Sequence, residues 1–312
     1  MNTTETNEAT LEDMQEAAEK VAEGKTWFDA LEASGLQITE KQKQDISEKI
    51  NDMLEYQPAI GLFGKTGTGK SSLCNALFGQ DVCPIDDVAA CTRDPQSVLL
   101  NMGCNGIKLI DVPGVGEGAE VDEMCEALYT ELLPKLDMVL WLVKADDRAT
   151  AADKDFYERI VRPAVEDKKP VFLVLTQVDK MEPCREWNVE QHEPGATQFQ
   201  NIYRKTALMS EEFGLRENQV IPVSAGEQYN LAKLVDEMVF ALPVEQNIAV
   251  LRAVNSEYRS EEATRYVKDN IFDMIGEIIG SVCFSASLAI SEIADTIHDW
   301  WHSHEPWWWP IR

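Results

Sequence analysis

The sequence lacks the features of a secreted or membrane-spanning protein. Its seven cysteines show no CxxC pair and no dense, even spacing, which argues against a disulfide scaffold and favours a reducing compartment. The first 20 residues are acidic and contain neither the basic nor the apolar region of a secretory signal. No uninterrupted apolar run reaches the ~20 residues that a spanning helix needs, and the longest uncharged stretch covers residues 278–291. We therefore expect a cytoplasmic protein.

Positive charge is also scarce. The chain has 28 Lys and Arg residues against 55 Asp and Glu residues, so its formal net charge is −27. A surface of this kind repels phosphate backbones, which argues against DNA binding and against general coating of nucleic acid. A local basic patch on a folded RNA-binding face stays open.

The pattern of apolar runs predicts one α/β domain with helical extensions. The 312 residues are 44% hydrophobic, enough for one substantial core. Continuous apolar runs of strand length alternate with helix-like segments, which is typical of a mainly parallel sheet covered on both faces. Only GCNG separates the second run from the third, so that pair should form an antiparallel hairpin. The six expected strands lie in AIGLFG, SVLLNM, IKLIDV, MVLWLVKA, VFLVLT and VIPVS.

Composition divides the chain into three regions. Residues 1–57 carry 14 acidic and 5 basic side chains at helical spacing and should form an acidic N-terminal helical region. Residues 58–243 hold the expected strands, and residues 244–312 form a helical tail with a Trp-rich end. We expect the apolar face of the tail to pack on the α/β domain or on the N-terminal helices. Contact with a membrane surface and self-association through this face are the alternatives, although the tail lacks the basic residues that attract anionic lipids.

The stretch GKTGTGKS at residues 64–71 predicts a phosphate-binding loop. Its glycines let successive backbone N–H groups point into one concavity at a helix N-terminus, where the helix dipole also favours an anion. Lys70 would reach the β- and γ-phosphates, and Ser71 would bind Mg²⁺. An ordinary glycine-rich turn is the alternative, but here an apolar strand precedes the match and the amphipathic SSLCNALF follows it.

Two further segments fit the Mg²⁺ ion and the γ-phosphate. Asp111 ends the expected strand IKLIDV, where its carboxylate can support Mg²⁺ through water, and Gly114 can turn its N–H toward a γ-phosphate. Thr92 lies in VAACTRDP, where its hydroxyl could complete the Mg²⁺ shell; an ordinary loop threonine is the alternative.

Guanine recognition is expected at the ends of the fifth and sixth strands. Asp179 in VFLVLTQVDK could accept two hydrogen bonds from the N1 and N2 edge of guanine, which adenine cannot offer. Ser224 and Ala225 in VIPVSAGE could present a backbone N–H to guanine O6. Either segment alone could be a simple strand end, and it is the order of all five segments that favours guanine.

The ordered series GKTGTGKS, Thr92, DVPG, TQVD and SA resembles the five guanine-nucleotide motifs of the translation-factor class of GTPases, in particular the Era-like branch. The longer strings KSSLCNALF, DVAACTRDP and VLWLVKADDRA are similar to the YfjP/YeeP-type bacterial GTPases. The resemblance covers roughly residues 58–243, which would then be the GTPase domain.

The resemblance implies a role for each matching residue. Ser71 and Thr92 would ligate Mg²⁺ with support from Asp111. Lys70, Thr92 and Gly114 would act in hydrolysis of GTP to GDP and phosphate. Guanine would be recognised by Thr176, Gln177 and Asp179 together with Ser224 and Ala225. The phosphates of GTP or GDP would be wrapped by Gly64, Lys65, Thr66, Gly67, Thr68, Gly69, Lys70, Ser71 and Ser72.

Two departures from the family pattern affect affinity and rate. The usual guanine box is NKxD, and here Thr176 and Gln177 replace its Asn and Lys, so we expect weaker nucleotide affinity with the guanine preference kept by Asp179. Val115 occupies the position where many GTPases carry a Gln that orients water. Hydrolysis should then be slow, on the order of 10⁻⁴ to 10⁻² s⁻¹, unless a partner or a dimer contact supplies the missing group. Glu117 is a weaker candidate for that group.

The sequence thus favours a Mg²⁺-dependent GTPase that acts as a molecular switch, with an unidentified protein effector or a second copy as partner. The alternatives are a module whose nucleotide controls self-assembly, with incidental hydrolysis, and a ribosome- or RNA-associated GTPase.

Overall fold

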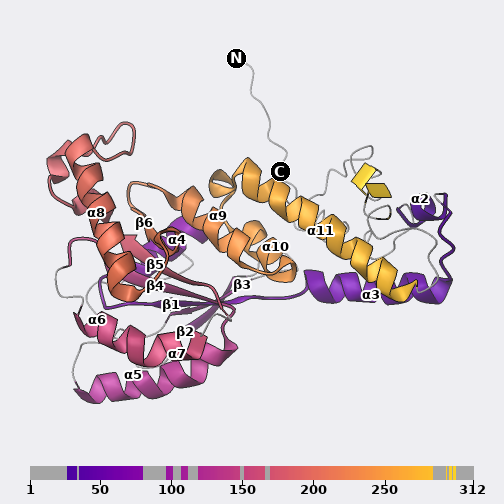
Figure 1. The fold of residues 1–312 in the computed structure, drawn as a ribbon, viewed down its shortest axis with the longest axis horizontal. Coiled ribbons are helices and arrows are strands. Elements are labelled where there is room, and N and C mark those ends of the chain that lie inside the picture. The colour runs from indigo at the N-terminus through magenta and orange to yellow at the C-terminus, as the bar shows by residue number, and fades with distance from the viewer. Residues whose placement is uncertain are drawn as a thin grey trace.

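The computed structural model describes residues 27–33, 35–79, 96–100, 107–111, 119–147, 151–165, 169–283, 293, 295, 296, 298 and 299. Within them a six-stranded sheet has the order β2-β3-β1-β4-β5-β6 (Figure 1). Five strands are parallel, and β2 pairs antiparallel with β3, as the short GCNG link predicts. The strands are β1 (Ala59–Phe63), β2 (Gln96–Leu100), β3 (Ile107–Asp111), β4 (Met138–Lys144), β5 (Val171–Thr176) and β6 (Val220–Pro222).

Helices cover both faces of this sheet. On one face lie α4, α9 and α10, and on the other lie α5, α6 and α7, with α8 beyond the β6 edge (Figure 1). These helices are α4 (Lys70–Phe78), α5 (Ala119–Leu132), α6 (Ala151–Phe156), α7 (Arg162–Val165), α8 (Ala196–Phe213), α9 (Leu231–Ala241) and α10 (Val244–Ala253). A π-helical turn, Tyr157–Val161, joins α6 to α7.

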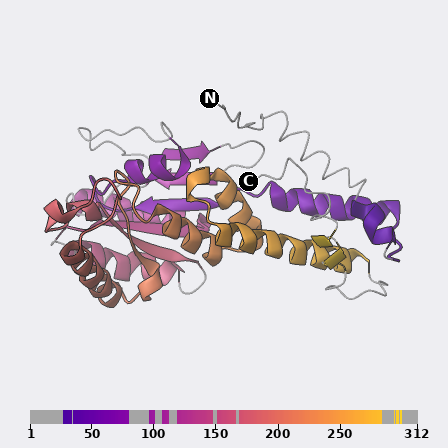
Figure 2. The same cartoon turned by 90° about the horizontal axis from the view of Figure 1, so that it is seen from above.

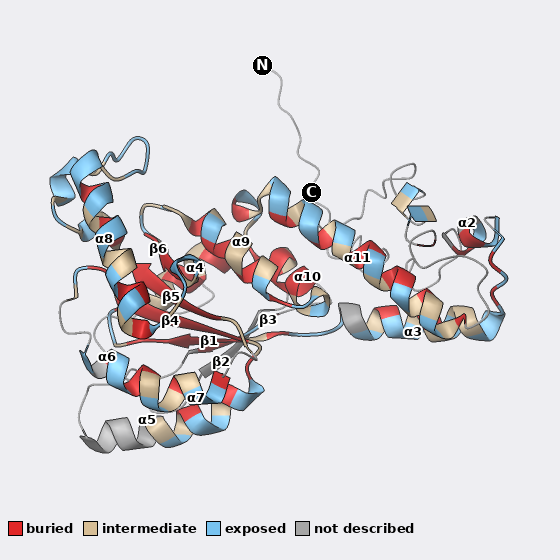
Figure 3. Ribbon diagram, viewed as in Figure 1, coloured by how far each residue is buried: buried red, intermediate tan, exposed pale blue. Residues whose placement is uncertain are grey.

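The central strands are apolar on both faces because each face has its own core. Along β4, Leu140 and Leu142 belong to the core under α4 and α9, whereas Val139 and Trp141 belong to the opposite one. The second core contains an aromatic cluster around the fully buried Trp141. Figure 3 shows buried residues along the strands and on the helix faces turned toward them. This two-sided burial explains why the strands are continuous apolar runs.

A helical arm leads away from the sheet. It consists of α2 (Trp27–Ala33), α3 (Glu40–Leu54) and α11 (Glu261–Val282), with α3 and α11 side by side in two views (Figures 1 and 2). Ile46 of α3 and Ile279 of α11 share one core. The Gln42 side chain donates to the Val282 carbonyl at 3.1 Å. The expected packing of the tail on the N-terminal helices is therefore confirmed for α11.

Hydrogen bonds at two places fix the base of the arm to the α/β body. The Asp137 carboxylate accepts hydrogen bonds from the Ala59 N–H at 2.7 Å, the Tyr56 hydroxyl at 2.9 Å and the Gln246 side chain at 3.0 Å. Burial, followed by this contact with Asp137, raises the pKa of Tyr56 to about 12. Separately, the Asn255 N–H, just after α10, donates to the Leu77 carbonyl near the end of α4 at 2.7 Å.

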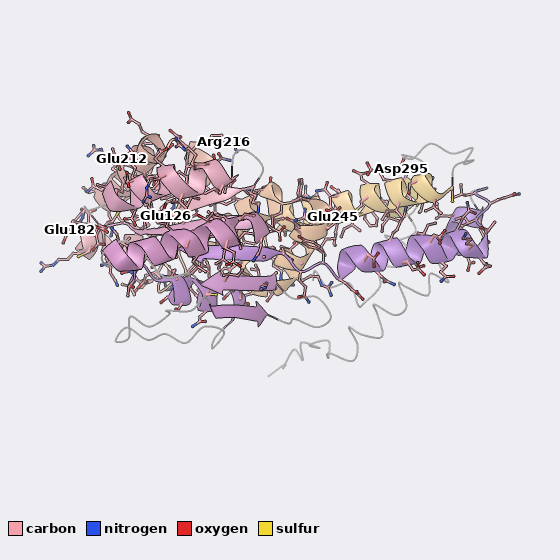
Figure 4. The ribbon with its side chains drawn as sticks, turned by 90° about the horizontal axis from the view of Figure 1, so that it is seen from below. Glu126, Glu182, Glu212, Arg216, Glu245 and Asp295 are labelled. Atoms are coloured by element: carbon pink, nitrogen blue, oxygen red, sulfur yellow. The ribbon has the colours of Figure 1, made fainter. Side chains whose placement is uncertain are left out.

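Acidic side chains lie on several elements of the described part of the chain. Figure 4 labels Glu126, Glu182, Glu212 and Glu245 around the body and Asp295 on the arm, together with the basic Arg216. Among the described residues, no helix is both long and apolar enough to cross a membrane.

Candidate nucleotide-binding site

The glycine-rich loop connects β1 to α4 at the carboxyl edge of the sheet. Gly64, Gly67 and Gly69 have φ angles of 142°, 78° and 90°, a range that residues with a side chain rarely adopt. The N-cap residue of α4 is Gly69, which has no side chain to cap the helix. The first turn of α4 therefore follows the loop directly, and its N–H groups belong to the helix end that favours an anion. The residue types at this turn therefore build a backbone cradle suited to an anion.

Internal hydrogen bonds hold this phosphate loop in shape. The Thr68 hydroxyl donates to the Lys65 carbonyl at 2.8 Å, and the Thr68 N–H donates to the same oxygen at 3.2 Å. The Lys70 ammonium lies across the loop, 2.9 Å from the Gly64 carbonyl oxygen. A cation thus stands within the cradle that the glycines form.

A second loop, after β5, is tied directly to the phosphate loop. The Thr176 hydroxyl donates to the Thr68 carbonyl at 2.6 Å in a buried position. The next residue, Gln177, is in the left-handed conformation with φ 57° and donates its side-chain amide to the Gly67 carbonyl at 3.0 Å. Thr176 and Gln177 therefore join the two loops, and the Thr176 hydroxyl is directed at the backbone of the phosphate loop.

Asp179 follows on the short helix η3 (Val178–Lys180) and is partly exposed. The buried Gln198 of α8 donates its side-chain amide to the Asp179 carbonyl at 3.0 Å and to the Met181 carbonyl at 2.8 Å. Because these contacts use main-chain oxygens, α8 fixes η3 without occupying the Asp179 carboxylate.

The loop after β6 lies beside η3. The Val178 N–H donates to the Val223 carbonyl at 3.3 Å, and Ser224, which follows, pairs with Tyr229 across a tight turn. Ser224 is buried and Ala225 is partly exposed. The structure thus brings the residues expected to recognise guanine to one edge of the sheet.

Three residues that no sequence pattern connects, Glu227, Trp187 and His192, brace this loop from outside. The Glu227 carboxylate accepts from the Trp187 indole N–H at 3.1 Å and lies 3.2 Å from Nδ1 of His192. Trp187 and Glu227 are 40 residues apart, and no local pattern links them.

Comparison with known proteins agrees with this geometry. Residues 59–177 match the family described as 50S ribosome-binding GTPase. The chain is 40% identical over 249 residues to YfjP of Escherichia coli K12, which covers 80% of this chain and 84% of YfjP. The chain belongs to the Era-like P-loop GTPases of the YfjP type. As a member of this family it binds guanine nucleotides and hydrolyses GTP.

Further proteins also resemble this chain. YkfA of Escherichia coli K12 is 39% identical over 75% of this GTPase and 79% of YkfA. GTPase Der of Leptospira interrogans is 27% identical over 68% of this chain and 40% of Der. Among solved structures, Era of Aquifex aeolicus bound to GDP and AlF4⁻ has 24% identity and a TM-score of 0.45, over 59% of this chain and 56% of that one.

The remaining expected residues of the GTPase site fall into two groups. Asp111 pairs in register with Leu62, so its backbone lies beside the start of the phosphate loop. Thr66 is exposed, and Ser71 and Ser72 are partly buried in the first turn of α4. The expected residues that lie outside the described part of the chain are Thr92, Gly114, Val115 and Glu117.

Lys65 makes an ion pair that the sequence did not reveal. Its ammonium lies 2.6 Å from one carboxylate oxygen of the buried Asp153 and 3.7 Å from the Asp147 carboxylate. The other Asp153 oxygen has no hydrogen-bond partner among the described residues. Burial raises the pKa of Asp153 above its usual value of 3.8, and the bond from Lys65 only partly offsets that rise. The Lys65 side chain therefore forms its shortest ion pair with α6.

Replacing Lys65 by Met is expected to destabilise the GTPase by roughly 1–3 kcal/mol, because it leaves the Asp153 carboxylate buried without its cation. We place the effect below that of a fully buried pair because the Lys65 side chain is 24% exposed. Urea denaturation at pH 7 measures it. The double variant Lys65→Met, Asp153→Asn has no buried charge and should regain most of the loss; an unchanged loss would contradict this explanation.

The pair also predicts a dependence on pH. Because the pKa of Asp153 is raised, the folded state binds its proton more tightly than the unfolded state does. The corresponding stabilisation is complete below pH 3.8 and is lost as the pH rises through the folded-state pKa. Asp153→Asn alone should therefore flatten the pH dependence of the unfolding free energy in this acid range.

Proposed function

We propose that the chain is a slow, guanine-selective switch that holds its nucleotide between the phosphate loop and the two loops after β5 and β6. The observation that carries this proposal is the pair of bonds that joins the loops, from the Thr176 hydroxyl to Thr68 and from the Gln177 amide to Gly67. Because the loops that would recognise guanine are rigidly connected to the phosphate loop, the two can bind the two ends of one GTP molecule.

In this proposal the backbone from Gly64 to Ser72 surrounds the phosphates, and Lys70 exchanges its bond to Gly64 for a phosphate oxygen. Asp179 reads the N1 and N2 edge of guanine, and the loop at Ser224 and Ala225 meets O6. Thr176 and Gln177 act by holding these loops together.

Mg²⁺ fits the donors at this site. Hydroxyl and carboxylate oxygens are its preferred ligands, and Ser71 is partly buried at the start of α4 while Asp111 is paired with Leu62 beside the loop. We propose Ser71 and Thr92 as ligands, with Asp111 in support. When bound, the ion neutralises charge on the β- and γ-phosphate oxygens.

We further propose that residues 58–243 form the GTPase domain and that residues 1–57 and 244–312 are its helical extensions. Gly114 and Thr92 would respond to the γ-phosphate, and the loss of that phosphate would release both. A cytoplasmic location stays a prediction.

The test is competition of GTP and ATP against a fluorescent guanine nucleotide on the purified chain, followed by phosphate release in a single turnover. We expect GTP to displace the probe far better than ATP, and turnover on the order of 10⁻⁴ to 10⁻² s⁻¹. Omitting Mg²⁺ should weaken GTP binding. Equal competition by ATP would make the chain a phosphate-loop protein of open specificity.

One observation favours a second candidate, a module whose nucleotide controls assembly. The segment that leads from α10 into the arm is hydrogen-bonded to the phosphate-loop helix α4 through Asn255 and Leu77, so this helix adjoins both the proposed nucleotide site and the base of the arm. Light scattering with GDP and with a non-hydrolysable GTP analogue distinguishes the two: a change of mass with nucleotide supports assembly. A ribosome-associated role has only the family description in its favour.

A further inference from the structure

Lys180 makes two contacts to Gln177 at the edge of the proposed site. Its ammonium lies 2.8 Å from the Gln177 side-chain oxygen Oε1, and its N–H donates to the Gln177 carbonyl at 3.0 Å. Lys180 is the last residue of η3 and is exposed. Its position thus fixes both the main chain and the side chain of Gln177.

The Gln177 amide has a donor nitrogen and an acceptor oxygen, and both make contacts in the structure. Its Nε2 donates to the Gly67 carbonyl at 3.0 Å, while its Oε1 faces the Lys180 ammonium. If the amide rotated by half a turn, Oε1 would face the Gly67 carbonyl oxygen, and Nε2 would face an ammonium. Both contacts would then be repulsive. The ammonium therefore selects the one orientation of the amide that joins the two loops.

The backbone of Gln177 indicates that this joint is under constraint. Gln177 has φ 57°, a left-handed conformation that is unfavourable for a residue with a side chain. Such conformations persist where the surrounding contacts enforce them, often at functional sites. Here the enforcing contacts are the bonds to Gly67 and to Lys180.

We propose that Lys180 is a positioning residue for nucleotide binding, acting through the Gln177 amide. By orienting that amide, Lys180 keeps the guanine-reading loop in register with the phosphate loop, so one nucleotide engages both. This inference rests on the proposed function and adds to it a residue outside the TQVD motif. Lys180 touches neither base nor phosphate in this role.

The role predicts an affinity effect that changes sign with the residue at position 177. In the natural chain, Lys180→Met frees the amide to rotate, and the dissociation constant for GDP should rise about threefold to tenfold. In a Gln177→Lys background, the ammonium groups at positions 177 and 180 would repel one another. Adding Lys180→Met removes this repulsion and should lower the dissociation constant for GDP. A merely structural contribution of Lys180 would weaken binding in both backgrounds.

Gln177→Glu supplies a second discriminating variant. A carboxylate forms a stronger contact with Lys180 but has no N–H for the Gly67 carbonyl, so the joint is lost. We expect GDP affinity to fall even though the ion pair is retained. An affinity equal to that of the natural chain would mean that the contact to Gly67 does not matter.

The experiment is titration of a fluorescent GDP analogue into the full-length natural chain and these four variants, with thermal unfolding of the nucleotide-free proteins alongside. Lys41→Met on the distant α3 is the control for loss of one positive charge, and it should bind as the natural chain does. If the natural chain itself fails to bind GDP, the proposed function is wrong. If it binds and Lys180→Met binds equally well, or the sign does not reverse, the role of Lys180 is wrong.

Discussion

Replacing Asp179 by Asn is expected to lower the affinity for GTP by roughly two to four orders of magnitude. The carboxylate can accept two hydrogen bonds from guanine, each worth roughly 1.5–3 kcal/mol when one partner is charged. An asparagine amide keeps one acceptor and turns a donor toward the other guanine N–H. One charged bond is lost, the other becomes a weaker neutral bond, and two donors now face one another, so the total loss is about 3–6 kcal/mol; each 1.4 kcal/mol is a factor of ten.

The same substitution should improve binding of xanthosine triphosphate. Xanthine carries a carbonyl at position 2 where guanine carries an amino group, so the asparagine donor meets an acceptor. Competition against a fluorescent guanine or xanthine nucleotide measures both changes. The loop should keep its place because Gln198 holds the main-chain oxygen of Asp179. Asp52→Asn on α3 is the charge-matched control, and an unchanged GTP affinity in Asp179→Asn would show that TQVD does not read guanine.

Gly64→Ala is expected to destabilise the fold by roughly 2–6 kcal/mol. A Cβ at this position would lie 2.4 Å from the Leu142 carbonyl oxygen, which belongs to the backbone of a central strand and cannot move aside. Overpacking of this kind costs roughly 1–3 kcal/mol. The φ angle of 142° adds a conformational penalty of roughly 1–3 kcal/mol. Chemical denaturation without nucleotide measures the total.

Gly67→Ala is the matched control for Gly64→Ala. Gly67 also has a positive φ, 78°, but nothing lies within 4 Å of an added Cβ. Its substitution should cost only the backbone penalty of roughly 1–2 kcal/mol. Equal losses in the two variants would mean that the contact with Leu142 is not the cause.

The parts of the fold that the sequence predicted are those with local causes. The continuous apolar run MVLWLVKA predicts a central strand because β4 is buried on both faces. The short GCNG link predicts the antiparallel pairing of β2 with β3. Within the segment from 151 to 165, a π-helical turn lies between α6 and α7, just before Pro163, which has no N–H to donate.

The parts that the sequence could not reveal depend on contacts between distant segments. Thr176 and Thr68 are 108 positions apart, and only the order of strands brings the hydroxyl to the carbonyl. The pairing of Lys65 with Asp153 likewise requires knowing that α6 begins beside the phosphate loop. The motif places Lys65 in the phosphate loop but does not specify the direction of its side chain, which pairs with Asp153 of α6.

Through the hydrogen bond between the Asn255 N–H and the Leu77 carbonyl, α4 directly connects the phosphate loop to the segment that leads into the arm. Its nine residues span about 13 Å at 1.5 Å per residue, with the phosphate loop at one end and the base of the arm near the other. A helix of this length is stiff along its axis, so an axial displacement at its first turn would be transmitted to the segment that leads into α11. A structural change at the phosphate site would then alter the position of the arm.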